Sequence, residues 1–139
     1  MSDIVYAQEQ DLSVDDYVEV LGHCALGRKR PLNDRARIEG MLANSNLIVT
    51  ARLDGRCVGI ARCFSDFGWT TYLSDLAVHD DFQKRGIGRR LIETVREVGG
   101  DGVGIGLFSV PDAIPFYEKL SEIGMSTEPG FWLPRTRGI

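Results

Sequence analysis

The stretch Asp81–Arg90 reads Asp-Phe-Gln-Lys-Arg-Gly-Ile-Gly-Arg-Arg and lies between a strand-like run at residues 70–78 and an amphipathic helical pattern. Gly86 and Gly88 lack the Cβ atoms that would hold a ligand away from the backbone. The first N–H groups of a helix have no partner inside it, and the helix dipole adds positive charge there. Four basic side chains surround the same end: Lys84, Arg85, Arg89 and Arg90. The stretch therefore predicts an anion site, and a pyrophosphate fits it best.

A bare Gly-x-Gly can also be a loop that only starts a helix and exposes a basic face to water. The spacing excludes two common phosphate loops. The third glycine of a dinucleotide fingerprint is missing, since Arg89 to Leu91 follow Gly88, and no Gly-Lys-Ser/Thr of a P-loop is present. A different phosphate-containing cofactor is expected.

With these residues in place, the chain resembles the GNAT superfamily of acetyl-CoA-dependent N-acetyltransferases. The family signature, Gln/Arg-x-x-Gly-x-Gly/Ala, stands here as Gln83-Lys84-Arg85-Gly86-Ile87-Gly88. Upstream, Leu76-Ala77-Val78 is similar to the fourth strand of the family. Downstream, Pro115-Phe116-Tyr117-Glu118-Lys119-Leu120 is similar to its C-terminal helix. The resemblance covers about residues 4 to 135.

This resemblance implies a fold and an activity. The expected fold is an α+β sandwich with a mixed, largely antiparallel sheet, helices on both faces, and fourth and fifth strands that splay apart. Residues 1–139 would form a single acetyltransferase domain. The expected reaction moves the acetyl group of acetyl-CoA to a primary amine, by direct attack through a tetrahedral intermediate and without an acetyl-enzyme.

The resemblance also implies roles for single residues. The Leu76 N–H would face the acetyl carbonyl oxygen, and Tyr117 would protonate the departing CoA sulfur. The residues expected to bind the cofactor are Leu76, Ala77, Val78, Gln83, Lys84, Arg85, Gly86, Ile87, Gly88, Arg89, Asp112 and Phe116.

The group that deprotonates the amine stays unassigned. Tyr72 and Ser74 occupy the strand positions where the family often has a Glu or His base, and regular alternation would place them on one face with Leu76. We expect both to contact the substrate, but neither is a good base near neutral pH. A water chain would then carry the proton. Asp75 would point to the opposite face unless a bulge turns it inward.

Composition limits the other possibilities. A net charge of −4 and a pI near 5.1 argue against a nucleic-acid binder. The basic run Arg28-Lys29-Arg30 is either a solvated loop, which we favour, or the rim of a phosphate or substrate site. Three cysteines without metal-ligand spacing indicate reduced packing residues, and two histidines far apart in sequence predict no metal site. The N-terminus lacks a secretory or membrane-spanning run, so a cytoplasmic protein is expected.

Local patterns predict the elements. Ser13 caps a first helix, Asn33 or Asp34 caps a second, and Asp54-Gly55 turns a hairpin. We also expect Asp112 to cap a late helix that has Pro115 in its first turn. The other expected elements are strands at 4–7, 47–53, 57–64, 70–78, 102–108 and 131–133 and a helix at 88–98.

Two other functions stay open. The missing base favours a module that binds acetyl-CoA as a sensor without turning it over. The acceptor could also be a protein amine, although the short loops favour a small molecule. In either case Phe131 and Trp132 could form a homodimer contact. No nucleic acid or membrane partner is expected.

Overall fold

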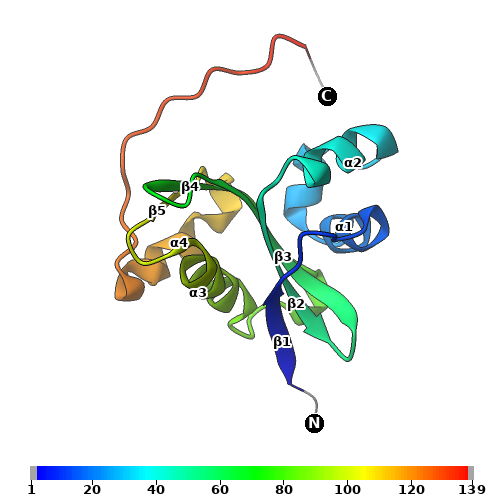
Figure 1. The fold of residues 1–139 in the computed structure, drawn as a ribbon, viewed down its shortest axis with the longest axis horizontal. Coiled ribbons are helices and arrows are strands. Elements are labelled where there is room, and N and C mark those ends of the chain that lie inside the picture. Colours follow the sequence, from blue (N-terminus) through cyan, green and yellow to red (C-terminus); the bar gives the residue numbers. More distant parts are fainter. Residues whose placement is uncertain (1–2, 138–139) are drawn as a thin grey trace. The chain divides into compact units, whose positions relative to one another are not determined.

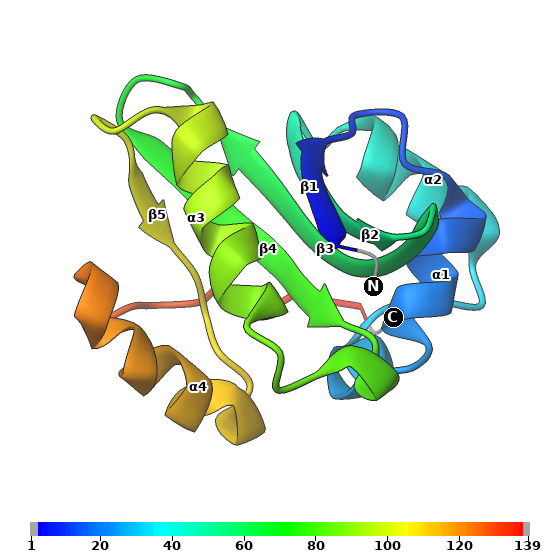
Figure 2. The ribbon, with the colours of Figure 1, turned by 90° about the horizontal axis from the view of Figure 1, so that it is seen from below.

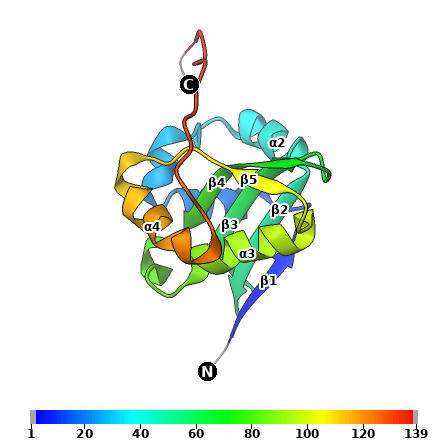
Figure 3. The same ribbon diagram turned by 90° about the vertical axis from the view of Figure 1, so that its left-hand side faces the viewer.

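The computed structural model describes residues 3–137, which divide into two compact units, one ending at residue 107 and one beginning at residue 108. The first unit contains a five-stranded sheet in the order β1-β2-β3-β4-β5, in which only β5 runs parallel to its neighbour (Figure 3). The strands are β1 (Ile4–Gln8), β2 (Leu47–Leu53), β3 (Arg56–Ser65), β4 (Thr70–Val78) and β5 (Gly104–Gly106). The predicted mixed, largely antiparallel sheet is confirmed.

Helices cover both faces of this sheet, as predicted. Figures 1 and 2 show α1 (Val14–Leu21) and α2 (Arg35–Ala43) on one face and α3 (Ile87–Gly99) on the other. The Ser13 and Asp34 side chains accept from the first-turn N–H groups of Asp16 and Arg37, so both predicted caps are confirmed.

The core forms where the helices meet the sheet. On the α1 and α2 face it includes Tyr17, Val20, Leu21, Ile38, Leu42, Ile48, Ile60 and Ala77. Each large apolar side chain buried in this way contributes roughly 1.5–3 kcal/mol. On the α3 face the helix approaches β3 closely, because a Cβ on Gly59 would lie 3.0 Å from Ile87 and 3.1 Å from Leu91. Cys57 and Cys63 are buried, and burial raises the pKa of each thiol to about 12, which fits packing residues.

The hairpin between β2 and β3 has Asp54 and Gly55 in the left-handed region, with φ values of 50° and 83°. Two left-handed central residues match the right-handed twist of the strands, so the predicted Asp-Gly turn is confirmed. The last strand of the sheet is shorter than predicted. The expected strand at 102–108 contributes only Gly104–Gly106 to the sheet.

A β-bulge in β4 determines the direction of the site residues. Arg62 of β3 lies opposite Asp75, whereas Cys63 lies opposite Leu73, so β4 carries one extra residue, Ser74, at this point. Directly opposed residues of antiparallel strands share a face, and a bulge shifts the alternation by one residue. Asp75 therefore lies on the same face as Arg62, the face that α1 and α2 cover.

The prediction that Tyr72 and Ser74 share a face with Leu76 is wrong for this reason. Tyr72 lies opposite Phe64, whose ring is 5.5 Å from the Arg62 guanidinium, so Tyr72 is on the Arg62 face. The Ser74 hydroxyl also contacts Arg62. Leu76 comes after the bulge and lies on the face that α3 covers.

The second unit contains η3 (Pro111–Ala113), α4 (Ile114–Lys119) and η4 (Leu120–Ile123). Asp112 does not cap α4, because it lies inside η3 and Ala113 occupies the cap position without a side-chain hydrogen bond. The predicted strand at 131–133 is also wrong. Phe131 and Leu133 are 96% and 92% exposed and belong to no strand, so they gain neither the pairing nor the burial that stabilises one.

Candidate functional site

The loop before α3 has the geometry that the sequence predicts for an anion site. Lys84 and Gly86 both have positive φ, 63° and 79°, which turns the chain into the helix at Ile87. Gly86 is the N-cap residue and has no side chain to accept the first-turn N–H groups. It is exposed, and a Cβ placed on it would meet no atom within 4 Å. The backbone here is therefore open to an anionic group.

Neighbouring residues hold this loop in place. The Gln83 side-chain amide donates to the Val78 carbonyl at 3.0 Å and to Asp80 at 3.1 Å, so it ties the loop to the end of β4. Ile87 is 1% exposed and anchors the start of α3 in the core. For these two residues the structure shows scaffold contacts, which leave the backbone of the loop as the ligand-facing part.

The basic residues of the loop take part in further contacts. The Arg85 guanidinium lies 5.2 Å from the centre of the Phe82 ring. Arg89 pairs with Glu93 at 3.8 Å, and Arg90 pairs with Glu97 at 2.8 Å. Both ion pairs are exposed to solvent, and exposed ion pairs are weak enough for a phosphate to compete with them.

The edge of β4 is open beyond its first residues. β5 pairs only with Thr70, Thr71 and Tyr72, so in the part of the chain that the structure describes β4 has a strand partner on its β3 side alone from Leu73 onward. The predicted splaying of the fourth and fifth strands is thus present. Leu76 and Val78 lie on this stretch and are half-buried, whereas Ala77 is buried against α1 and α2. An open strand edge can pair with the amide groups of an extended ligand.

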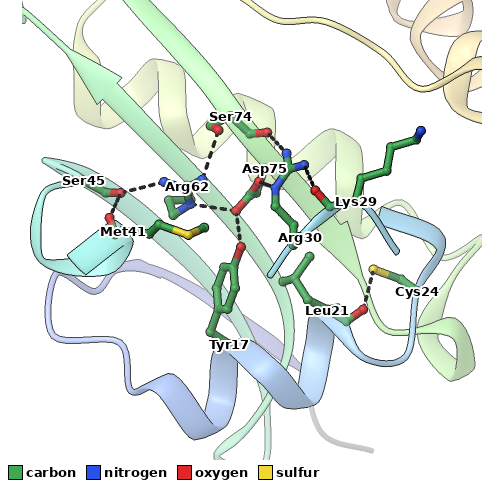
Figure 4. A network of polar contacts seen from close by, with 10 residues as sticks. All are labelled: Tyr17, Leu21, Cys24, Lys29, Arg30, Met41, Ser45, Arg62, Ser74 and Asp75. Carbon is green, nitrogen blue, oxygen red and sulfur yellow. Dashed lines mark hydrogen bonds and ion pairs between the residues drawn. The ribbon is translucent and has the colours of Figure 1, made fainter. Parts of the chain in front are cut away.

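At the bulge, a buried polar network surrounds Asp75 (Figure 4). Its carboxylate accepts from the Tyr17 hydroxyl at 2.6 Å, from Arg30 Nε at 2.6 Å and from Arg62 Nε at 2.7 Å. The Asp75 side chain is fully buried, and those of Arg62 and Arg30 are 5% and 20% exposed. Asp75 is therefore held as an acceptor by donors from α1, from β3 and from the loop at Arg30.

Both guanidiniums also bind Ser74. Arg30 Nη2 donates to the Ser74 carbonyl at 2.8 Å, and Arg62 Nη2 donates to the Ser74 hydroxyl at 3.0 Å. The remaining contacts run from Arg62 Nη1 to Ser45 Oγ and from Arg30 Nη1 to the Lys29 carbonyl. The favoured interpretation of Arg28-Lys29-Arg30 as a solvated loop therefore fails for Arg30, while Arg28 and Lys29 are exposed.

These contacts exclude Asp75 as the missing base, although the bulge does turn it to the face of Tyr72 and Ser74. Burial would raise the pKa of its carboxyl, but the charges and hydrogen bonds of Arg62 and Arg30 lower it below the usual value. Burial and the Asp75 charge raise the pKa of Tyr17 above its usual value. Neither group exchanges protons readily near neutral pH.

In the second unit, Tyr117 lies on α4 and is half-buried. Burial raises the pKa of its hydroxyl to about 12, so the group carries its proton at neutral pH and can donate it. The Phe116 ring packs edge-on against the Tyr117 ring, with centroids 5.0 Å apart. Asp112 is exposed.

The two histidines, far apart in sequence, lie together in the structure. The rings of His23 and His79 stack at 4.5 Å with an interplanar angle of 17°, and Glu19 lies close enough for the three side chains to offer ligand atoms within 4.8 Å. The cluster does not fit a metal ion, because His79 Nδ1 accepts the Asp81 N–H and its Nε2 lies 3.3 Å from Arg56. A metal bound at His79 Nε2 would need the tautomer with its proton on Nδ1, and it would lie next to the Arg56 guanidinium. Because the two rings are nearly parallel, the lone pairs of His23 and His79 also do not point at one metal position.

The chain is similar to known acetyltransferases. A model of the Acetyltransferase (GNAT) family matches residues 10–121. The chain is 33% identical over 120 residues to the uncharacterized N-acetyltransferase ycf52 of Pyropia yezoensis and 35% identical to that of Porphyra purpurea, and each match covers 77% of this chain and 64% of the relative. The chain thus spans somewhat less than two thirds of the length of these relatives.

Solved structures share the fold. A GNAT-family acetyltransferase of Streptococcus pneumoniae TIGR4 superposes with a TM-score of 0.67 at 18% identity, over 96% of this chain and 99% of that one. The aminoglycoside N-acetyltransferase AAC(6')-Iy in complex with CoA superposes with a TM-score of 0.74, also at 18% identity, over 99% of this chain and 97% of that one. Within residues 3–137, every helix is too short or too polar to span a membrane.

Proposed function

Because this chain belongs to the GNAT acetyltransferase family, we propose that it transfers the acetyl group of acetyl-CoA to a primary amine of a small molecule. The observation that carries the proposal is the exposed backbone at Gly86, with open space beside it at the start of α3. The N–H groups of that helix turn and the guanidiniums of Arg85 and Arg89 are suited to a pyrophosphate. Lys84 and the backbone of Gly88 complete the expected cradle.

The open edge of β4 supports the second half of the cofactor site. Main-chain groups of Leu76 and Val78, on either side of Ala77, would pair with the amides of the pantetheine arm, as an added strand would. Asp112 and Phe116 are the further residues that we expect to contact the cofactor. Acetyl-CoA supplies the activated thioester. The residues of the chain bind and orient the reactants and protonate the leaving sulfur.

In the proposed reaction the neutral amine attacks the thioester carbonyl carbon and forms the C–N bond of a tetrahedral intermediate. The C–S bond breaks when this intermediate collapses. The Leu76 N–H stabilises the negative charge that develops on the carbonyl oxygen, an effect typically worth about 10²–10³ in rate. Tyr117 gives its proton to the departing sulfur, and its hydroxyl is protonated at neutral pH because its pKa is about 12. The proton lost by the amine leaves through water, because Asp75 is occupied by three donors.

We favour a small-molecule acceptor, because one structure with the same fold is an aminoglycoside N-acetyltransferase. A protein amine and a sensor that binds acetyl-CoA without turnover are the competing outcomes. The lack of a carboxylate or imidazole at Tyr72 and Ser74 is the observation that favours the sensor.

The test is a thiol-release assay with acetyl-CoA and a panel of small amines, run beside a Tyr117→Phe variant and a Tyr6→Phe control. Release that depends on an amine, and that falls only in Tyr117→Phe, supports the proposal. Acetyl-CoA binding with no release above background, for every amine and for a lysine peptide, would instead support a sensor. Acetylation of the peptide alone would make the acceptor a protein amine.

We also propose that the protein is cytoplasmic. We further propose that it forms a homodimer through Phe131 and Trp132, which are 96% and 57% exposed. Light scattering of the wild type and of a Phe131→Ser variant tests the dimer. A wild type that scatters as a monomer would refute it.

A further inference from the structure

The polar network at the β4 bulge carries more positive than negative charge. Two guanidiniums, Arg30 and Arg62, face one carboxylate, Asp75, and among residues 3–137 their other acceptors are neutral hydroxyl and carbonyl oxygens. Tyr17, the remaining titratable member, keeps its proton because its pKa is raised. The network therefore holds one uncompensated positive charge in a largely buried position.

A buried net charge is costly unless an opposite charge or several hydrogen bonds accompany it. Arg62 is nearly inaccessible, at 5% side-chain exposure, whereas Arg30 is 20% exposed and forms the outer side of the network. The neighbouring Lys29 is exposed, and its backbone carbonyl accepts from Arg30 while its side chain extends away from the network (Figure 4). An anion that approaches this surface would meet Arg30 first.

The hydrogen-bond donors that remain point to the same ligand. A guanidinium has five N–H donors, and Arg30 uses three, toward Asp75, Ser74 and Lys29. The Ser74 hydroxyl accepts from Arg62, so its own proton is left to donate. Arg30 and the Ser74 hydroxyl together thus offer three unused N–H and O–H donors, and such donors suit a carboxylate or phosphate oxygen.

This position is close to the proposed chemistry. Ser74 precedes Leu76 by two residues, and a regular strand advances about 3.3 Å per residue, so across the bulge the two lie at most about 7 Å apart along β4. An amine whose nitrogen reaches the carbonyl carbon beside Leu76 can therefore place a group a few bonds away at Ser74. A polycationic acceptor would instead bring like charge to Arg30.

We propose that the acceptor is an amine that also carries an anionic group, a carboxylate or a phosphate, and that Arg30 and Ser74 bind this group. The inference rests on the proposed acetyl transfer and names its substrate class. Arg30 is then a specificity-determining residue, which Asp75 and the β4 bulge hold in position.

The first experiment measures binding without turnover. The arginine Nε–Hε resonances of the ¹⁵N-labelled protein, free and with CoA, are followed during titration with β-alanine, with β-alaninamide, in which a neutral amide replaces the carboxylate, and with the dication putrescine. A saturable shift of the Arg30 resonance with β-alanine, and none with the other two probes, is expected. Equal shifts with β-alanine and β-alaninamide, or no shift with β-alanine, would overturn the inference.

The second experiment measures selectivity as the ratio of kcat/KM for β-alanine to that for β-alaninamide. Loss of a charge-assisted hydrogen bond typically changes such a ratio about tenfold or more. Arg30→Met should bring the ratio close to one, and Arg30→Lys should restore part of it. Arg35→Met is the matched control, because Arg35 is 63% exposed on α2 and pairs with Asp15. Selectivity that survives in Arg30→Met would contradict the assignment.

The two experiments separate this inference from the proposed function. If β-alanine shifts the Arg30 resonance but no amine is acetylated, the anion site stands and the transfer activity fails. If amines are acetylated with no preference for the anionic member and the Arg30 resonance does not move, the transfer activity stands and the anion site fails.

Discussion

Replacing Asp75 with asparagine should strongly destabilise the protein. Asparagine is nearly isosteric, so the change removes the negative charge and leaves the shape. It leaves Arg62, at 5% side-chain exposure, and Arg30, at 20%, without a counter-charge. Breaking a buried ion pair by removing one partner costs about 3–5 kcal/mol, a large share of the roughly 5–15 kcal/mol that stabilises a typical domain.

Urea unfolding followed by circular dichroism measures this loss. The matched control is Asp15→Asn, since Asp15 also pairs with an arginine but is 83% exposed. An exposed pair of this kind contributes about 0–1 kcal/mol. If Asp75→Asn loses no more stability than Asp15→Asn, the network does not hold Arg30 and Arg62 as described.

Three further outcomes are expected. The stability of the wild type relative to Asp75→Asn should be greatest above the ordinary carboxyl pKa of about 3.9 and should shrink as pH falls through the lowered pKa of Asp75 in the folded state. Urea midpoints at several pH values measure this difference, and a difference that grows in acid would contradict the prediction. Gly27→Ala should unfold at a clearly lower temperature, because its Cβ would lie 1.8 Å from the Leu21 carbonyl oxygen. Gly40→Ala, whose Cβ would have no atom within 4 Å, should gain up to about 1 kcal/mol of stability. Equal melting temperatures of the two variants would refute this. Tyr117→Phe should lower kcat about 10²–10⁴-fold with unchanged acetyl-CoA affinity. Because the pKa of Tyr117 is about 12, the wild-type rate should show no loss from its ionisation below about pH 10. Full turnover in the variant would remove Tyr117 from the mechanism.

The parts of the fold that the sequence predicts correctly depend on local chemistry. The caps Ser13 and Asp34 and the turn at Asp54-Gly55 involve residues at most three positions apart, so each can be recognised from its own neighbourhood. The exposed loop at Gly86 also follows from local features, because a glycine with positive φ at a helix start needs no distant partner.

The parts that it misses depend on pairing over long distances. Asp75 is joined to Arg30 across 45 residues and to Tyr17 across 58, and the extra residue at Ser74 is defined only by the register with β3. One signal was available, because a carboxylate between Leu73 and Ala77 in an apolar strand requires buried cationic partners. The sequence does not say which of the sixteen basic residues provide them.

The elements near the C-terminus are mispredicted for a different reason. Asp112 has the residue type of a cap, but a 3₁₀ turn places it one step too early in the chain to serve α4. Phe131 and Leu133 have the alternation of a strand, and strand formation also requires a partner edge that alternation does not supply.

The most direct test of the account is a calorimetric titration of acetyl-CoA into the wild type and two variants of Gly86. Gly86→Ala meets no atom within 4 Å, so it adds only the strain of its φ of 79°, roughly 1–2 kcal/mol, and should still bind. Gly86→Glu places a carboxylate where the pyrophosphate is proposed to lie and should not bind. Saturable binding by the wild type and Gly86→Ala, lost in Gly86→Glu, is the predicted result; no binding by the wild type, or equal binding by Gly86→Glu, would contradict the account.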